Sequence, residues 1–171
     1  MTNDNDPFRI QDGPVALIMK GRAQQAQLCD DLENIADQLG GKVDESLSRS
    51  VLVKLLQDLP IFQSDEEALF DVLRLRNKDN ALLDQCINLS LNDHQACTSY
   101  ALELYEPLRD LAAGKRVFHA DTFGYMLRCF FDHTRRHLNW EEVTIFGPPL
   151  STLSDLDLEN ISERLALKRS V

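Results

Sequence analysis

Apolar side chains recur along the chain at spacings of three, four and seven residues. The first such run begins at Asp12-Gly13-Pro14, ends at Gly40-Gly41, and contains Leu17, Gly21, Leu28, Leu32, Ile35 and Leu39. This period places the apolar positions on one face of an α-helix. Proline near the first turn and glycine after the last turn are typical of helix ends. We therefore expect a first helix between these two signals.

Four more segments carry the same period, and no segment shows the alternation of a β-strand. The expected helices run from Asp44 to about Asn77, from about Asn80 to Ala113, from about His119 to Phe146, and from Ser154-Asp155 to Leu167. Pro60 should bend the second helix, and Pro107 should kink the end of the third. Four long amphipathic helices with short connections predict an all-α, antiparallel up-down four-helix bundle with a short C-terminal tail helix.

The length of 171 residues suits one compact domain. We expect residues 1–171 to form a single bundle, with its core at about residues 14–150 and the tail helix at about residues 154–167. The four cysteines stand singly in helical patterns, without close pairs. This spacing argues against a zinc finger or a dithiol redox motif, so the thiols are expected in the core.

The charge balance narrows the classes of partner. With 28 acidic and 18 basic residues, the formal net charge is -10, which disfavours binding to nucleic acid because phosphates would be repelled. The apolar run from Val15 to Met19 is too short to span a membrane, and residues 1–6 lack the basic region of a signal peptide. We expect a cytoplasmic protein without membrane contact, and leave open a protein partner or a homodimer.

Polar side chains interrupt the apolar face of the fourth helix. His133, His137 and Glu141 stand four residues apart and continue the face of Phe123 and Phe130. Burial of such groups costs several kcal/mol unless they are hydrogen-bonded, paired or bound to an ion. They are therefore either hydrogen-bonded core or edge residues, or metal ligands.

Two other helices carry polar groups at comparable positions. His94 lies on the apolar face of the third helix, and Glu66 lies on that of the second, next to Glu67. In a bundle, such side chains from facing helices can converge on a metal ion. The run of three acids at residues 65–67 is equally compatible with a solvated surface.

The order of these motifs resembles the hemerythrin-like, HHE-type cation-binding family. The similar segments are residues 28–37, 58–70, 92–94, 137–148 and 158–169. The resemblance implies a four-helix bundle with a non-haem di-iron centre, whose ligands are one His each from helices one and three and a His-x-x-x-Glu pair each from helices two and four. Of these ligands, His94, His137, Glu141 and either Glu66 or Glu67 have counterparts here.

Two histidines of that pattern are missing. Arg22, Gln24 and Gln25 stand where the first helix should provide a His, and Phe62 or Gln63 replaces the His of the second helix. The resemblance then implies a mononuclear or incomplete di-iron site, to which His133 could add a substitute ligand. An inward-pointing Arg22 could instead pair with Glu66 or Glu141 and replace the metal.

The leading interpretation is a protein that binds iron or another divalent cation, in iron, oxygen or nitric oxide handling or sensing, with a small diatomic molecule as a further ligand. The alternative is a metal-free interaction or regulatory module. An enzyme such as a carboxylate-bridged oxidase is least favoured, because the full ligand set is absent.

Overall fold

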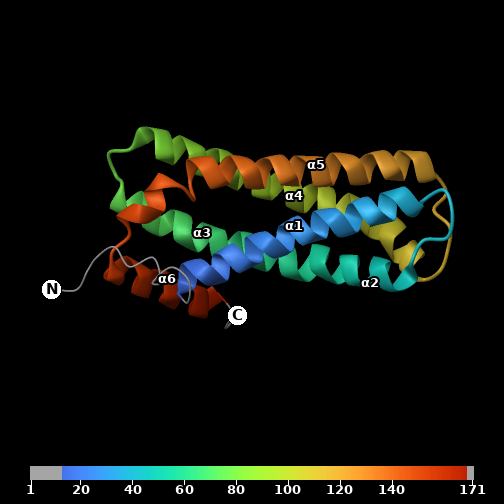
Figure 1. Cartoon of the computed structure of the whole chain (residues 1–171), viewed down its shortest axis with the longest axis horizontal. Helices are drawn as coiled ribbons and strands as arrows, with labels where there is room; N and C mark the ends of the chain where they lie inside the picture. Colours follow the sequence, from blue (N-terminus) through green and yellow to red (C-terminus); the bar gives the residue numbers. More distant parts are fainter. Residues whose placement is uncertain (1–12, 169–171) are drawn as a thin grey trace.

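The computed structural model describes residues 13–168, and all regular structure within this range is helical (Figure 1). The helices are α1 (Pro14–Gln38), α2 (Glu45–Val53), α3 (Leu59–Arg76), α4 (Ala81–Ala112), α5 (Ala120–Thr144) and α6 (Asp155–Lys168). The prediction of an all-α protein is confirmed. Asp12 and residues 1–6, on which two of the expectations above depend, lie outside the described residues.

In Figure 1 the long helices lie side by side and alternate in direction along the bundle, and the rods are α1, α2 together with α3, α4 and α5. Helix α1 packs against α5, α2 packs against α4, and α4 packs against α5. Helix α6 lies beside one end of the bundle and packs against α3 and α1. The chain is thus a helical bundle with a C-terminal tail helix, as its periodicity predicts.

The backbone hydrogen-bonding pattern changes from α-helical to π-helical just before Pro60. Residues Lys54–Asp58 form a π-helical turn in which the Leu59 amide bonds to the Lys54 carbonyl. Proline has no amide hydrogen to donate to the carbonyl four residues back. A short π-helical turn accommodates this missing hydrogen bond, and the helix continues into α3.

Polar side chains cap the starts of α2 and α4, and a glycine follows the end of α4. The Asp44 carboxylate accepts hydrogen bonds from the Ser46 and Leu47 amides, and the Asn80 side chain accepts one from the Leu83 amide. Gly114 follows α4 with φ +72°, a conformation that favours glycine. These contacts satisfy amides and end α4 where the sequence predicts.

The buried apolar side chains form two clusters that are separated along the bundle. One gathers residues 28–36, 51–59, 97–111 and 123–131, and the other gathers residues 68–73, 83–87 and 145–165 with Ile18. Between the clusters, each rod contributes buried polar residues, which are Arg22, Gln25, Gln63, Asp65, Glu66, Ser90, His94, Thr134, His137 and Glu141. All four rods change from apolar to polar at the same level, so the bundle contains one polar layer.

Two positions depart from the expected apolar faces. Leu17 is exposed, and its neighbours Val15 and Ile18 are buried instead. On α5, His133 is only partly buried, whereas Thr134 is buried. Steps of four residues rotate by about 40° beyond a full helical turn, so His133, eight residues from Glu141, reaches the edge of the buried face.

Within residues 13–168, no helix combines the length and the apolar character that crossing a bilayer requires.

Candidate metal centre

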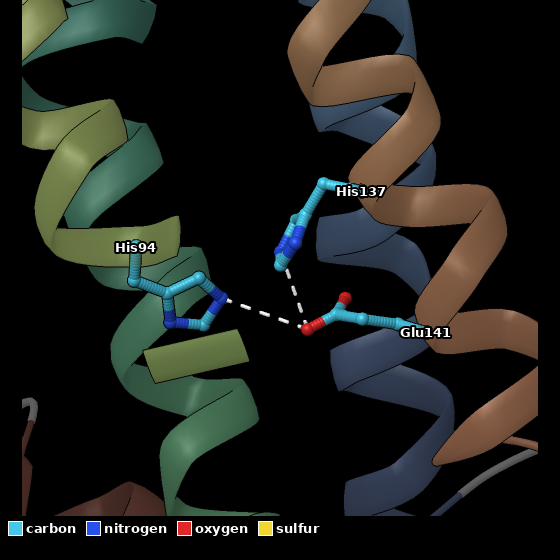
Figure 2. A group of neighbouring side chains, drawn as sticks. All are labelled: His94, His137 and Glu141. Carbon is cyan, nitrogen blue, oxygen red and sulfur yellow. Dashed lines mark ion pairs between the residues drawn. The ribbon is translucent and has the colours of Figure 1, made fainter. Parts of the chain in front are cut away.

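Three buried side chains from two helices meet in the polar layer (Figure 2). His94 comes from α4, and His137 and Glu141 come from successive turns of α5. Their exposed fractions are 3%, 8% and 0%. One nitrogen or oxygen atom of each lies within 4.8 Å of the others. This group could hold a metal ion.

The separations between these atoms suit a single ion. Glu141 Oε1 lies 3.2 Å from His137 Nε2 and 3.8 Å from His94 Nε2. An ion bonded at ~2.1 Å holds neighbouring ligand atoms roughly 3.0 Å apart in an octahedron and ~3.4 Å apart in a tetrahedron. The group therefore needs only small side-chain movements to surround an ion.

Glu66 of α3 adds a second carboxylate to this group. Its Oε2 atom lies 3.2 Å from His94 Nε2, and the side chain is 1% exposed. Glu66 Oε2, His94 Nε2 and His137 Nε2 are all buried without a hydrogen-bond partner among the described residues. Buried polar atoms are normally satisfied, and these atoms lie at ion-pair distance from one another or from Glu141 Oε1, so either a proton or a metal ion between them can satisfy them.

Two further carboxylates orient the imidazole rings from outside. His94 Nδ1 lies 3.3 Å from Glu67 Oε1, and His137 Nδ1 lies 3.2 Å from Asp93 Oδ2. A hydrogen bond at Nδ1 favours the tautomer whose Nε2 lone pair is free for a metal. Glu67, one of the predicted ligands, is placed to support His94 and not to bind the ion directly. The supporting role of Asp93 was not predicted from the sequence.

Arg22 of α1 contacts the carboxylates of Glu66 and Glu141 on the side away from the two imidazoles. It is 6% exposed and donates hydrogen bonds to Glu66 Oε1 at 3.2 Å, to Glu141 Oε2, and to the Leu138 carbonyl at 2.7 Å. Its guanidinium also stacks over the Phe146 ring, 3.9 Å from the ring centre. The inward orientation considered from the sequence is therefore observed.

Gln25 and Ser90 complete the hydrogen bonding of the carboxylates. Gln25 Nε2 donates to Glu66 Oε1 at 3.0 Å, and Ser90 Oγ donates to Glu141 Oε1. Ser90 lies on the buried face of α4, where it could have been recognised from the sequence as a polar interruption four residues before His94. Its role was missed because a serine in a helix often bonds only to its own backbone.

Two buried glutamines, Gln25 and Gln63, stand where the resemblance led us to expect histidines. Gln25 and Gln63 are buried at 1% and 5% exposure, whereas Gln24 is exposed. The Phe62 ring lies against the backbone of α1 at Gly21, so close that a Cβ added to Gly21 would be 3.1 Å from it. Gln25 and Gln63 are therefore the residues that stand in the layer where imidazoles were expected.

Charge interactions in the layer favour a protonated His94 and an ionised Glu141. Burial alone lowers the pKa of His94, but the nearby carboxylates of Glu66 and Glu67 outweigh it and raise the pKa to about 9. Burial also acts to raise the pKa of Glu141, yet contacts with His137, Arg22 and Ser90 lower it to about 2. In the absence of metal, a proton on His94 therefore compensates negative charge in the layer.

His133 does not join this group. Its ring stacks on that of His137, with the centres 6.5 Å apart and an interplanar angle of 11°. It faces a hollow between α4 and α5, which contains none of the four central residues. The structure thus brings together His94, His137, Glu141 and Glu66, places Glu67 behind His94, and leaves His133 outside.

Comparison with protein-family models, curated proteins and solved structures finds no match for this chain.

Proposed function

We propose that this protein binds one divalent metal ion, iron in the first instance, through His94, His137, Glu141 and Glu66. The observation that carries the proposal is the convergence of three buried ligand atoms, Glu66 Oε2, His94 Nε2 and His137 Nε2, beside Glu141 Oε1. Two imidazoles with carboxylates suit iron(II), as in non-haem sites with two His and one carboxylate. The hemerythrin-like arrangement expected from the sequence points to the same metal.

Charge favours one ion over two. Glu66 and Glu141 carry two negative charges, and Arg22 supplies one positive charge to the oxygens that face away from the imidazoles. A second ion on that side would lie against the guanidinium and be repelled. Gln25 and Gln63 offer only amides there, which are weaker ligands than imidazole for iron. The proposed centre is therefore mononuclear.

The role that follows is binding, in iron, oxygen or nitric oxide handling or sensing. Four protein ligands leave positions free on an ion that takes six, so water or a diatomic molecule could bind there.

A second candidate function is that of a metal-free interaction or regulatory module. The observation in its favour is the pairing of Arg22 with both central carboxylates, which already neutralises part of the buried charge. A proton on His94 would then balance the remainder. In this case the layer would fix the packing of the bundle, and function would reside on its surface.

Anaerobic loading separates the two candidates. Purified protein is incubated with iron(II), freed of excess metal by gel filtration, and analysed for iron and for melting temperature. We expect about one iron per chain and a higher melting temperature, because a ligand that binds only the folded state stabilises it. His137→Ala should abolish retention, whereas His119→Gln, at the exposed start of α5, should retain iron like the wild type. Absence of retained iron in the wild type would support the metal-free module.

A further inference from the structure

A hollow opens at the end of the bundle where the α1–α2 and α4–α5 connections lie (Figure 1). Its volume is about 650 Å³, and small-molecule pockets in proteins occupy roughly 300–1,000 Å³. Residues within 39–45, around the first connection, form one wall, and residues within 111–120, around the second, form the other. The proposed iron ligands do not line it, so this end hollow is a separate feature of the bundle.

Part of the lining of the end hollow is apolar and continuous with the core. Leu111 is buried, and Leu39, Val43 and Val117 are partly buried side chains that pack against the same apolar cluster. A Cβ added to Gly40 would meet no atom within 4 Å, which shows open space beside this turn. A ligand in the end hollow would therefore cover apolar surface that the fold leaves in contact with water.

Three exposed basic side chains from both connections also line the end hollow, namely Lys42, Lys115 and Arg116. Lys115 Nζ pairs with Asp110 Oδ1 at 3.3 Å. Lys42 and Arg116 form no ion pair with any residue in the part of the chain that the structure describes. Two cations from different connections thus remain available to a ligand that enters between them.

Glu45 is the one acidic side chain that lines the end hollow within residues 13–168. Its Oε2 atom lies 3.7 Å from Arg49 Nη1, and its Oε1 atom would be 3.0 Å from a Cβ added to Gly114. The carboxylate is therefore paired and lies against the α4–α5 connection. The end hollow carries a local excess of positive charge, although the chain as a whole carries -10. Distant surface charges are screened beyond ~8 Å at physiological ionic strength, so these local cations determine which ligand is attracted.

We propose that the end hollow binds a small organic acid, with a carboxylate carried on an apolar body of the size of a medium-chain fatty acid. The apolar lining contacts the body, and Arg116 and Lys42 bind the carboxylate, to which a guanidinium can donate two parallel hydrogen bonds. A bare inorganic anion would leave the apolar lining uncovered. A neutral hydrocarbon would leave the two cations without a partner. The two kinds of lining together therefore select an amphipathic anion.

Displacement of the fluorescent dye anilinonaphthalene sulfonate tests the proposal on the full chain. The dye joins an aromatic body to an anionic sulfonate, and its emission rises when the rings leave water. We expect the wild type to bind the dye and octanoate to displace it. Octanol has the same chain without the charge, and acetate has the charge without the chain. Each of these two should require at least tenfold higher concentrations than octanoate.

Substitutions of the two unpaired cations locate the binding. Arg116→Ala and Lys42→Ala should each weaken octanoate binding at least fivefold, and Arg116→Lys should retain part of it because the charge remains. Lys78→Ala is the matched control, because Lys78 is an exposed lysine in the connection between α3 and α4, at the other end of the bundle. It should bind as the wild type does. Since the substituted side chains are exposed, all variants should melt within a few degrees of the wild type, which separates lost binding from lost folding.

Each contrary outcome overturns a defined part of the proposal. No displacement of the dye by octanoate would exclude an organic acid as the ligand. Octanol as effective as octanoate would show that the end hollow is only an apolar surface, and acetate as effective would show that it is only a site for simple anions. Octanoate binding within twofold of the wild type in the double variant Lys42→Ala/Arg116→Ala would place the ligand elsewhere on the chain.

Discussion

Arg22 and His137 contact opposite oxygens of one carboxylate, that of Glu141. The guanidinium of Arg22 donates to Oε2, and His137 Nε2 lies 3.2 Å from Oε1. The carboxylate therefore has one oxygen committed to an internal cation and the other directed toward the proposed ion. This division explains how one layer can contain both a buried ion pair and a metal centre.

Replacement of Arg22 should destabilise the protein strongly. Arg22→Gln would leave Glu66 and Glu141 without their cation inside the bundle, and removal of one partner of a buried pair costs ~3–5 kcal/mol. Arg128→Gln is the control, because Arg128 pairs with the exposed Asp37 and exposed pairs contribute at most about 1 kcal/mol. Urea unfolding of the two variants measures both effects. Equal losses in the two variants would show that Arg22 does not compensate buried charge.

The metal-free protein should lose stability as the solution becomes alkaline. The pKa of His94 is raised from 6.5 to about 9 in the folded protein, so its charge contributes stability that is fully present below about 6.5 and lost as the pH rises through about 9. Metal binding should strengthen over the same range, because the ion replaces the proton on His94. Unfolding measured from pH 6 to pH 9.5 tests this, and His94→Gln should flatten the dependence. A stability that increases over this range in the wild type would contradict it.

At acid pH the stability of the protein should instead decrease as the pH falls. The pKa of Glu141 is lowered from 4.5 to about 2, so its ionised form contributes stability that is present above about 4.5 and lost as the pH falls through about 2. Glu141→Gln should remove part of this acid sensitivity while lowering stability at neutral pH. Thermal unfolding between pH 2 and pH 5 provides the measurement. An unchanged acid profile in the variant would assign the sensitivity to other carboxylates.

A histidine restored at the correct position should tighten metal binding. Gln25 is buried against Glu66, whereas the adjacent Gln24 is exposed. Gln25→His should therefore raise the amount of iron retained, because it adds an imidazole at Glu66 Oε1, on the Arg22 side where only amides stand, and Gln24→His should leave it unchanged. If the layer is a closed metal-free network, Gln25→His would instead gain no iron and lose ~1–3 kcal/mol of stability through an unsatisfied buried group. Iron titration together with unfolding distinguishes these results.

Asp93 should matter for affinity although it would not touch the ion. It holds Nδ1 of His137, and substitution of such supporting carboxylates typically weakens metal binding ~10–100-fold. Asp93→Asn is compared with Asp132→Asn, an exposed position on α5. Equal iron affinities in the two variants would exclude the supporting role.

The fold was predictable because helical period and end signals agree along the chain. On α4, the apolar positions from Leu83 to Leu108 recur at helical spacing and form the buried face, together with the polar positions Ser90 and His94. Leu17 was misplaced because one leucine near a helix start does not fix the phase of the face. The correct phase depends on packing against neighbouring helices, which a single sequence does not contain.

The site was only partly predictable, because the sequence does not determine the direction of each side chain. Polar residues at core positions identified His94, His137, Glu141 and Glu66, because each breaks an apolar period. Arg22 breaks such a period too, but its long side chain can equally extend to solvent, so its inward direction needed the structure. His133 was assigned to the centre from four-residue spacing alone, and the rotation of about 40° per step places it beyond the buried face.

Anomalous diffraction at the iron absorption edge, from crystals loaded anaerobically with iron(II), tests the central claim most directly. The account predicts a single anomalous peak inside the polar layer, within about 2.3 Å of His94 Nε2, His137 Nε2 and Glu141 Oε1, with Arg22 still paired to the far oxygen of Glu141. No peak in the layer, with the His94 and His137 rings closed by hydrogen bonds to Glu66 and Glu141, would contradict it.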